Sequence, residues 1–247
     1  MMFMSKVAII MPVYNEAETI ENTIREIKNK IIDKINFVDV WIFEDGSTDG
    51  TKEILKKLEN EIPNLYVQLE EDRKGYSKAM KEAFLIINTK DYKYVMAIDS
   101  DGQYDPNDFF KLWEVFKKDS PDIVMGMRVK RAEPFWRRFL SWGLKILERF
   151  MFPISCDDVT SVMRLMSVET AHVIAKEVKY SKYNFWLEFT ARTALKGYEV
   201  TELPVTYRER MGGSRVYNIR NIFKILISEF NALICVKNEW KMMKKKQ

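Results

Sequence analysis

Short apolar runs alternate, in the first half of the chain, with stretches whose apolar residues recur every three or four positions. Runs of four to eight apolar residues are typical of buried strands, and the longer spacing is typical of amphipathic helices. The pattern predicts strands at Val7–Met11, Asp39–Phe43, Tyr66–Leu69, Tyr94–Ile98 and Asp122–Arg128. It predicts helices at about Ala17–Lys30, Thr51–Glu59, Ser77–Asn88 and Asp105–Lys117. This alternation predicts an α/β fold with a mostly parallel sheet and helices on both faces.

The second half of the chain has a different pattern. Residues of about 134–152 mix aromatic and aliphatic side chains with Arg and Lys, which fits an ordinary packing helix or a helix in a membrane interface. A further helix is predicted from Phe185 to about Gly197, and a strand follows at Tyr198–Tyr207. From about residue 218 the chain reads as an amphipathic helix with a lysine-rich end. We therefore expect one domain over residues 1–217, with the helix at about 134–152 as part of it, and an amphipathic basic tail over residues 218–247.

Composition narrows the class of protein. The 247 residues are 47% hydrophobic, enough for one substantial α/β core, and the net charge of +4 is too small for a nucleic-acid-binding surface. Cys156 and Cys235 have neither metal-binding nor redox spacing. No run of about 18 uncharged apolar residues is present, so we expect no transmembrane helix. The N-terminal residues lead straight into a strand pattern, so we also expect no cleavable signal peptide.

Acidic residues follow two of the predicted strands. Glu44 and Asp45 end one strand, while Asp99, Asp101 and Gln103 follow another. Ligands bind beyond the carboxyl ends of parallel strands, so both groups should line one crevice. Gathered carboxylates repel each other unless a cation joins them, and a divalent metal bridges carboxylates to phosphates. An ordinary acidic turn is the alternative for the second group, but its place at the sheet edge favours a metal site.

Four segments carry a family resemblance. In chain order they read VAIIMPVYNEAETI, FEDGSTDGT, RKGYSKAMKEAF and AIDSDGQYDPND. Together they resemble the family-two glycosyltransferases, whose catalytic domain has the GT-A nucleotide-diphospho-sugar transferase fold. The chain is most similar to the polyprenyl-phosphate sugar transferases, the group that dolichyl-phosphate mannosyltransferase typifies. No GxxxxGK[ST] and no GxGxxG after the first strand are present, which disfavours a P-loop or a Rossmann site.

The resemblance implies an activity. It is the inverting transfer of a sugar from a nucleotide-diphosphate sugar, GDP-mannose or a UDP-hexose, to polyprenyl or dolichyl phosphate. It also implies a peripheral protein at the cytoplasmic face of the cell membrane, with Mg²⁺ or Mn²⁺ as cofactor and no nucleic-acid partner. The resemblance further implies that the domain over residues 1–217 is a catalytic one and that the helix at about 134–152 lies in the membrane interface.

The resemblance also implies a role for individual residues. The nucleotide sugar would contact Pro12, Tyr14, Glu16, Glu44, Asp45, Asp99, Ser100, Asp101, Arg210 and Arg215. The metal would be held by Asp99, Asp101 and Gln103, and the acceptor phosphate by Arg128, Arg137 and Ser141. Of these, Asp101, Arg128 and Arg137 would be catalytic.

This sequence departs from the family pattern at several positions. Glu44 stands where Asp is common, which keeps the charge, and Arg215 stands where Lys is usual. The spacing before Arg215 leaves open whether Arg208 or Arg210 has the family role in that loop. Val162 replaces a usual glycine, and because a β-branched residue disfavours positive φ, we expect a different loop geometry there.

The acceptor and the role of one glutamate remain open at this stage. An enzyme acting on a saccharide hydroxyl would need a general base, for which Asp157 and Asp158 are candidates. A phosphate acceptor needs none, because it is largely dianionic at neutral pH. A catalytically silent binding protein on the same fold is a third possibility, which the intact Asp99-Ser100-Asp101 disfavours. Glu188 would either meet the hydroxyls of the donor sugar or lie on a helix surface.

Overall fold

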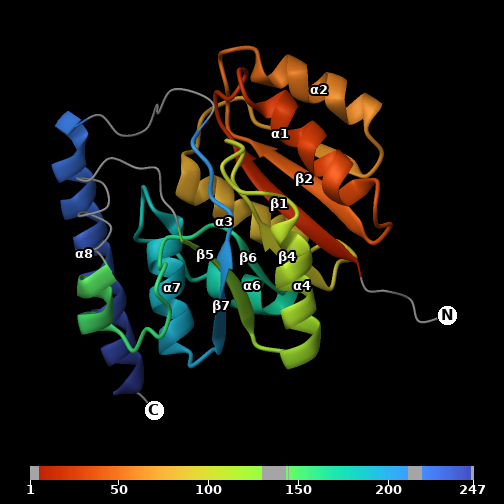
Figure 1. The fold of residues 1–247 in the computed structure, drawn as a ribbon. Helices are drawn as coiled ribbons and strands as arrows, with labels where there is room; N and C mark the ends of the chain where they lie inside the picture. The colour runs from red at the N-terminus through yellow and green to blue at the C-terminus, as the bar shows by residue number, and fades with distance from the viewer. Residues whose placement is uncertain (1–5, 130–142, 144, 211–218, 246–247) are drawn as a thin grey trace.

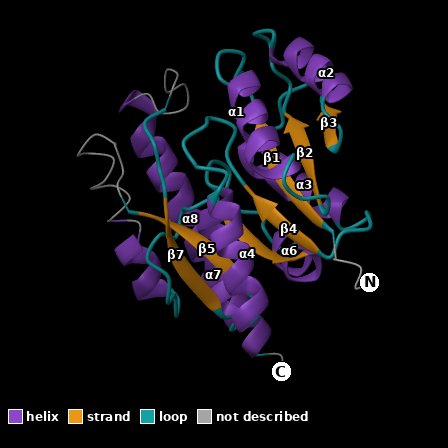
Figure 2. Ribbon diagram, turned by 45° about the vertical axis from the view of Figure 1, so that its right-hand side comes forward, coloured by secondary structure: helices purple, strands orange, loops and turns teal. Residues whose placement is uncertain are grey.

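A seven-stranded sheet forms the centre of the molecule (Figures 1 and 2). The computed structural model describes residues 6–129, 143, 145–210 and 219–245, the last range without the side chains of residues 219–223. The strand order is β3-β2-β1-β4-β6-β5-β7. The strands are β1 (Val7–Val13), β2 (Val38–Glu44), β3 (Leu65–Leu69), β4 (Tyr94–Ala97), β5 (Ile123–Arg128), β6 (Arg164–Ser167) and β7 (Val200–Val205).

Strand direction places the functional loops at one edge. β3, β2, β1 and β4 pair in parallel, and so do β5 and β7. Only β6 among these strands is antiparallel to its neighbours, β4 and β5. The carboxyl ends of β1, β2, β4, β5 and β7 therefore share one edge, which confirms the expected mostly parallel sheet. β6 was not predicted from the sequence, because its four residues give too short a pattern to distinguish a strand.

Helices cover both faces of the sheet, as expected. They are α1 (Ile20–Ile27), α2 (Thr51–Glu61), α3 (Tyr76–Ile87), α4 (Asp108–Asp119), α6 (Val168–Ala175), α7 (Phe185–Leu195) and α8 (Ile219–Lys244), with a π-helical turn η1 at Lys28–Ile32 and a helical segment at 145–151. α1, α2 and α4 lie on one face, while α3, α6 and α7 contact one another on the other (Figure 1). α8 packs on α7 at the margin.

β1 continues through Pro12, where the sequence pattern predicted its end. The oxygen of Ile10 accepts a hydrogen bond from Ile98, on the β4 side, whereas the oxygen of Val13 accepts from Asp45, on the β2 side. Pro12 therefore turns the place of its missing N–H toward β4, which has already ended at Ala97. A proline is tolerated where a strand has no partner on that side.

The apolar residues form two clusters. The larger fills both faces of the sheet beneath α1 to α7. The smaller lies between α7, α8 and the segment 145–151 and includes Leu187, Leu233 and Val236. Glu148 is fully buried beside this second cluster, and neither of its carboxylate oxygens has a hydrogen-bond partner among the described residues. Burial raises the pKa of Glu148 well above its usual value, although Arg164 opposes the shift.

Glu148→Gln is expected to stabilise the protein by about 1 to 2 kcal/mol at pH 8, or roughly 3 to 6 °C in Tm. A carboxyl whose folded pKa is raised gives its full contribution below the unfolded value of 4.5, and loses it as the pH rises toward the folded pKa. Thermal melts of both proteins between pH 4.5 and 9 should therefore diverge as the pH rises. Glu114→Gln, at an exposed glutamate of α4, is the control. A difference in Tm that stays constant with pH would contradict the assignment.

Candidate active site

The loops after β1 and β2 hold each other at the carboxyl edge of the sheet. The backbone N–H of Asn15 donates to Ser47 Oγ at 2.8 Å, and that of Glu16 donates to Thr51 Oγ1 at 2.9 Å. Asn15 adopts a left-handed conformation (φ 54°), which asparagine tolerates better than most residues. These bonds attach the loop that carries Tyr14 and Glu16 to the loop that follows the carboxylates at the end of β2.

Asp45 joins the end of β2 to the loop before α3. Its two carboxylate oxygens accept from the backbone N–H groups of Lys74, at 2.7 Å, and Gly75, at 2.9 Å. Gly46 allows this approach, because a Cβ there would lie 2.5 Å from the nitrogen of Arg73 and its φ is +72°. The Arg73 guanidinium lies over the Tyr14 ring at 3.9 Å, a cation–π contact at the same edge.

A shallow hollow opens beside Glu44. It is lined by Phe43, Glu44, Asp45, Gln68, Glu70, Lys74, Ala79 and Glu82. One oxygen of Glu44 accepts from the backbone N–H of Ser47. Oε2 is buried without a hydrogen-bond partner among the described residues, although Lys52 Nζ lies 3.8 Å from it. An unsatisfied buried carboxylate oxygen is costly, so it is suited to accept a hydrogen bond from a ligand.

Asp99 and Asp101 stand together beyond β4, on a turn in which Ser100 is buried. Burial and the neighbouring Asp101 raise the pKa of Asp99 to about 8, and burial likewise raises the pKa of Asp101. Neighbouring carboxylates supply the hard oxygen donors that Mg²⁺ and Mn²⁺ prefer. The described residues contain no cluster of three His, Cys, Asp or Glu side chains that could hold a metal. A metal bound here would therefore need other oxygen donors as well, which fits a cation shared with a diphosphate.

Gln103 is held in place beside this pair. Its backbone N–H donates to Asp101 Oδ1 at 3.1 Å, its Oε1 accepts from the Tyr207 hydroxyl at 2.9 Å, and its Nε2 donates to the oxygen of Arg208 at 3.0 Å. The backbone of Gln103 thus contacts Asp101, while its amide oxygen is engaged by Tyr207. The side-chain hydrogen bonds attach the segment after β7 to the loop after β4.

Two arginines after β7 point in different directions. Arg208 binds Glu26 at 2.8 Å and Asp105 at 2.6 Å, away from the Asp99–Asp101 pair. Arg210 pairs with Glu16 and has Nη1 3.8 Å from Asp101 Oδ2. Of the two candidates that the sequence left open, Arg210 is therefore the one that the structure places among the acidic residues of the site.

Arg128 ends β5 in a tightly held ion pair. Its Nε and Nη2 donate to the two carboxylate oxygens of Asp158, each at 2.7 Å, and Nη2 also donates to Thr160 Oγ1 at 2.9 Å. Only 9% of the Arg128 side chain and 3% of the Asp158 side chain are exposed. Burial acts to lower the pKa of Arg128, but Tyr104 and Asp158 outweigh it and raise that pKa well above its usual value. The guanidinium is thus a fixed cation, and its charge opposes the rise in the pKa of Asp99.

Several residues for which the sequence suggested a role lie outside the described residues or have different contacts from those expected. Arg137, Ser141 and Arg215 lie outside the described residues, so their roles stay predictions. Val162 is buried and does not have positive φ; its N–H donates to the Tyr104 hydroxyl. Glu188 is neither exposed nor directed at a donor sugar, because it is fully buried and pairs with Arg192. Its carboxylate accepts backbone N–H groups of residues 179–181, and therefore has a structural role.

Arg73, Tyr207 and the partner of Arg128 were missed from the sequence. Arg73 stands inside the quoted segment RKGYSKAMKEAF, so its motif signalled the loop but not the contact with Tyr14. The Asp158–Arg128 pair joins residues 30 positions apart, and no local sequence pattern predicts such a contact.

Several known proteins are similar to this chain over most of its length. Residues 8–174 match the model of glycosyl transferase family 2. The chain is 28% identical over 218 residues to an undecaprenyl-phosphate mannosyltransferase of Micrococcus luteus, covering 85% of this chain and 87% of that protein. It is also 28% identical over 213 residues to a dolichyl-phosphate hexose transferase of Haloferax volcanii, covering 85% and 86%.

A solved structure confirms the expected fold. A mannosyltransferase from Pyrobaculum calidifontis, determined in complex with GDP-Man and Mn²⁺, aligns with a TM-score of 0.64 at 20% identity. The alignment covers 93% of this chain but spans only 64% of that one. The architecture is therefore the GT-A glycosyltransferase fold. Since the family model matches more than half of the sequence, the chain belongs to glycosyl transferase family 2.

Proposed function

We propose that this enzyme transfers a sugar from a nucleotide-diphosphate sugar to polyprenyl phosphate, with inversion at the anomeric carbon and with a divalent metal. The observation that carries the proposal is the arrangement at the sheet edge, where Asp99 and Asp101 lie near Arg128 and Arg210. Carboxylates that can bind a cation therefore lie close to arginines that can bind phosphates. The names of the relatives, which include undecaprenyl-phosphate and dolichyl-phosphate transferases, support a lipid phosphate as acceptor.

The donor is proposed to lie across the loops of β1, β2 and β4. Glu44 and Asp45, with Pro12 and Tyr14, would contact the nucleoside. Oε2 of Glu44, which accepts no hydrogen bond from the described residues, is suited to accept one from a base N–H. Asp99, Asp101 and Gln103 would hold Mg²⁺ or Mn²⁺ against the diphosphate. When bound, the metal would neutralise charge that grows on the leaving diphosphate.

Arginines are proposed to support both phosphates. Arg210, already beside Asp101, would assist the leaving group, and Arg215 would join it from the loop that follows. Arg128 would bind the acceptor phosphate, together with Arg137 and Ser141. A guanidinium is permanently charged and is suited to orient an anion.

The two candidate bases for a hydroxyl acceptor are both engaged by cations. The Lys145 hydrogen bond lowers the pKa of Asp157, and Arg149 adds to the effect. Asp158 carries the bidentate Arg128. A general base works best with a pKa near the working pH, so these contacts favour a phosphate acceptor, which needs no base.

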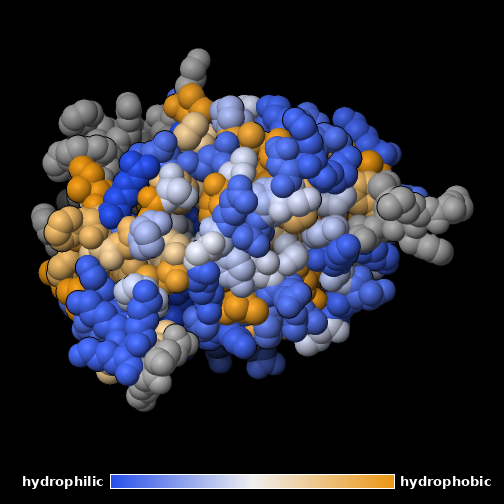
Figure 3. Space-filling model, turned by 90° about the horizontal axis from the view of Figure 1, so that it is seen from below, coloured by the Kyte–Doolittle hydropathy of each residue, from blue (hydrophilic) through white to orange (hydrophobic). Residues whose placement is uncertain are grey.

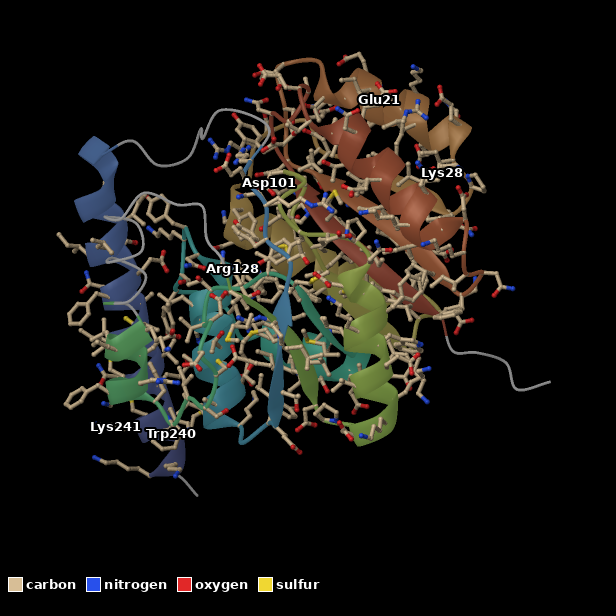
Figure 4. The ribbon with its side chains drawn as sticks, in the orientation of Figure 1. Glu21, Lys28, Asp101, Arg128, Trp240 and Lys241 are labelled. Atoms are coloured by element: carbon tan, nitrogen blue, oxygen red, sulfur yellow. The ribbon has the colours of Figure 1, made fainter. Side chains whose placement is uncertain are left out.

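Membrane attachment is proposed to be peripheral. No described helix is long and apolar enough to cross a bilayer. Exposed apolar side chains gather on α8 and the segment 145–151, namely Ile146, Phe150, Ile227, Phe230, Met242 and Met243, on the side that Figure 3 shows with many hydrophobic residues. Trp240 and Lys241 lie at the end of α8 remote from Asp101 (Figure 4). The basic end of the helix would thus contact anionic lipid away from the catalytic edge, at roughly 1 kcal/mol for each lysine.

A donor and acceptor screen tests the proposal. GDP-mannose, UDP-glucose and UDP-N-acetylglucosamine are each offered with Mn²⁺ or Mg²⁺ and a short polyprenyl phosphate, and the lipid-linked sugar is measured. We expect one donor to give product that disappears with a chelator. Transfer to a panel of saccharides, with none to polyprenyl phosphate, would contradict the proposed acceptor. Full transfer with chelator present would contradict the metal.

A further inference from the structure

The turn at residues 157–158 connects the helical segment 145–151 to Arg128. On the helix side, Asp157 Oδ1 receives Lys145 Nζ at 2.5 Å and Arg149 Nη2 at 2.8 Å. On the site side, the next residue, Asp158, receives the guanidinium of Arg128. Successive residues of one turn thus bind the helix and the site arginine.

Glu202, on β7, fixes the 157–158 turn through two hydrogen bonds. Its Oε2 accepts from the N–H of Asp157 at 2.5 Å, and its Oε1 accepts from the N–H of Asp158 at 2.8 Å. One carboxylate that accepts two successive backbone N–H groups determines the orientation of the peptide between them. Charge-assisted bonds of this kind are about twice as strong as neutral ones.

The helical segment presents three different faces. Leu147 and Met151 pack on the second apolar cluster. Lys145 and Arg149, four residues apart, reach Asp157. Ile146 and Phe150 are exposed, and Phe150 is 85% exposed. A short helix held by core packing and ion pairs is a firm support for the turn, and its third face exposes apolar side chains.

We propose that Asp157 and Glu202 are positioning residues for the acceptor phosphate: they fix the 157–158 turn, so that Asp158 holds the Arg128 guanidinium in the direction of the site. This inference rests on the proposed function, in which Arg128 binds that phosphate. Neither residue contacts the substrate. The segment 145–151 thereby supports acceptor binding through ion pairs as well as through its exposed apolar face.

Steady-state kinetics with a short, detergent-dispersed polyprenyl phosphate tests the inference, because the dispersed acceptor removes membrane partitioning. Glu202→Gln keeps the volume but replaces one acceptor oxygen by an NH₂ group, which cannot accept an N–H. It is expected to raise the acceptor KM about 10-fold. Asp157→Ala is expected to raise it about 3- to 10-fold. The donor Kd, measured by calorimetry, should change less than 2-fold in both.

A double-mutant cycle tests the connection to the helix. Lys145→Ala/Arg149→Ala should raise the acceptor KM about as much as Asp157→Ala, and the triple variant no more than either, because all three remove the same ion pairs. Glu114→Ala, which breaks an exposed ion pair on α4, is the matched control and should leave the KM unchanged.

The outcomes separate this inference from the proposed function. If the wild-type protein transfers sugar to polyprenyl phosphate and the variants keep its acceptor KM within 2-fold, the positioning role is wrong and the function stands. Independent, additive effects in the cycle would also overturn it. Equal losses in donor and acceptor binding would indicate general unfolding of the site, and would contradict a role confined to the acceptor. Absence of any transfer by the wild type would instead contradict the proposed function.

Discussion

Asp101→Ala is expected to lower kcat/KM for sugar transfer by at least about 10³-fold, a loss of roughly 4 kcal/mol in transition-state stabilisation. Asp101 lies beside Asp99, with Arg210 Nη1 3.8 Å from its Oδ2, so its removal takes one of two adjacent carboxylates from the proposed cation site. Leaving-group charge that a metal would neutralise is then left to arginines alone. Because the turn is also held by the Gln103 N–H on Asp101 Oδ1, the isosteric Asp101→Asn is the better probe of charge.

Metal binding gives a readout that does not depend on turnover. Mn²⁺ affinity in the presence of a nucleoside diphosphate, followed by calorimetry or by paramagnetic relaxation of water, should fall at least 10-fold in Asp101→Asn. Asp119→Ala, at an exposed position at the end of α4, is the control. Wild-type affinity and turnover in Asp101→Asn would show that this carboxylate holds no metal.

The fold of the first half could be predicted because each element there is long enough to show its period. β1 and β2 each contribute seven largely buried residues, and α3 and α4 twelve residues each. Their order alone placed Glu44, Asp45, Asp99 and Asp101 at one edge, since parallel strands end on the same side. Boundaries moved by one to three residues, as at β1, where continuation through Pro12 depends on the length of the neighbouring strand.

In the second half, α7, β7 and α8 lie where the sequence pattern predicts them, but tertiary contacts decide several other features. β6 is four residues long and is set between β4 and β5 by pairing, not by a pattern of its own. Glu188 reads as a helix-surface residue, yet the helix that carries it is buried on almost every side, and Arg192 neutralises it. Similarly, Arg208 and Arg210 have the same residue type two positions apart, and only their partners distinguish them.

Arg128→Lys is expected to raise the acceptor KM about 10- to 100-fold while the donor Kd stays within about 2-fold. The substitution keeps the positive charge, but an ammonium cannot reproduce the fork that places Nε and Nη2 on the two oxygens of Asp158. Asp158, only 3% exposed, would keep the backbone N–H of residue 128 but would lose one of its two contacts with the cationic side chain, so the cation would lose its fixed direction.

Comparing Arg128→Ala with Arg128→Lys separates the effect of the positive charge from the effect of the guanidinium geometry. Arg128→Ala leaves the buried Asp158 carboxylate without its guanidinium, which costs about 3 to 5 kcal/mol in comparable buried pairs and should lower the Tm markedly. The lysine variant should be far less destabilised, because a cation remains. Arg25→Lys, at an exposed arginine of α1 that pairs with Glu21 and Glu61, is the control and should change neither Tm nor KM appreciably. If Arg128→Lys melts at the wild-type temperature and has the wild-type acceptor KM, the geometry of the guanidinium is not needed for acceptor binding. If the donor Kd weakens as much as the acceptor KM, Arg128 serves the diphosphate, and the acceptor phosphate must be bound by other residues.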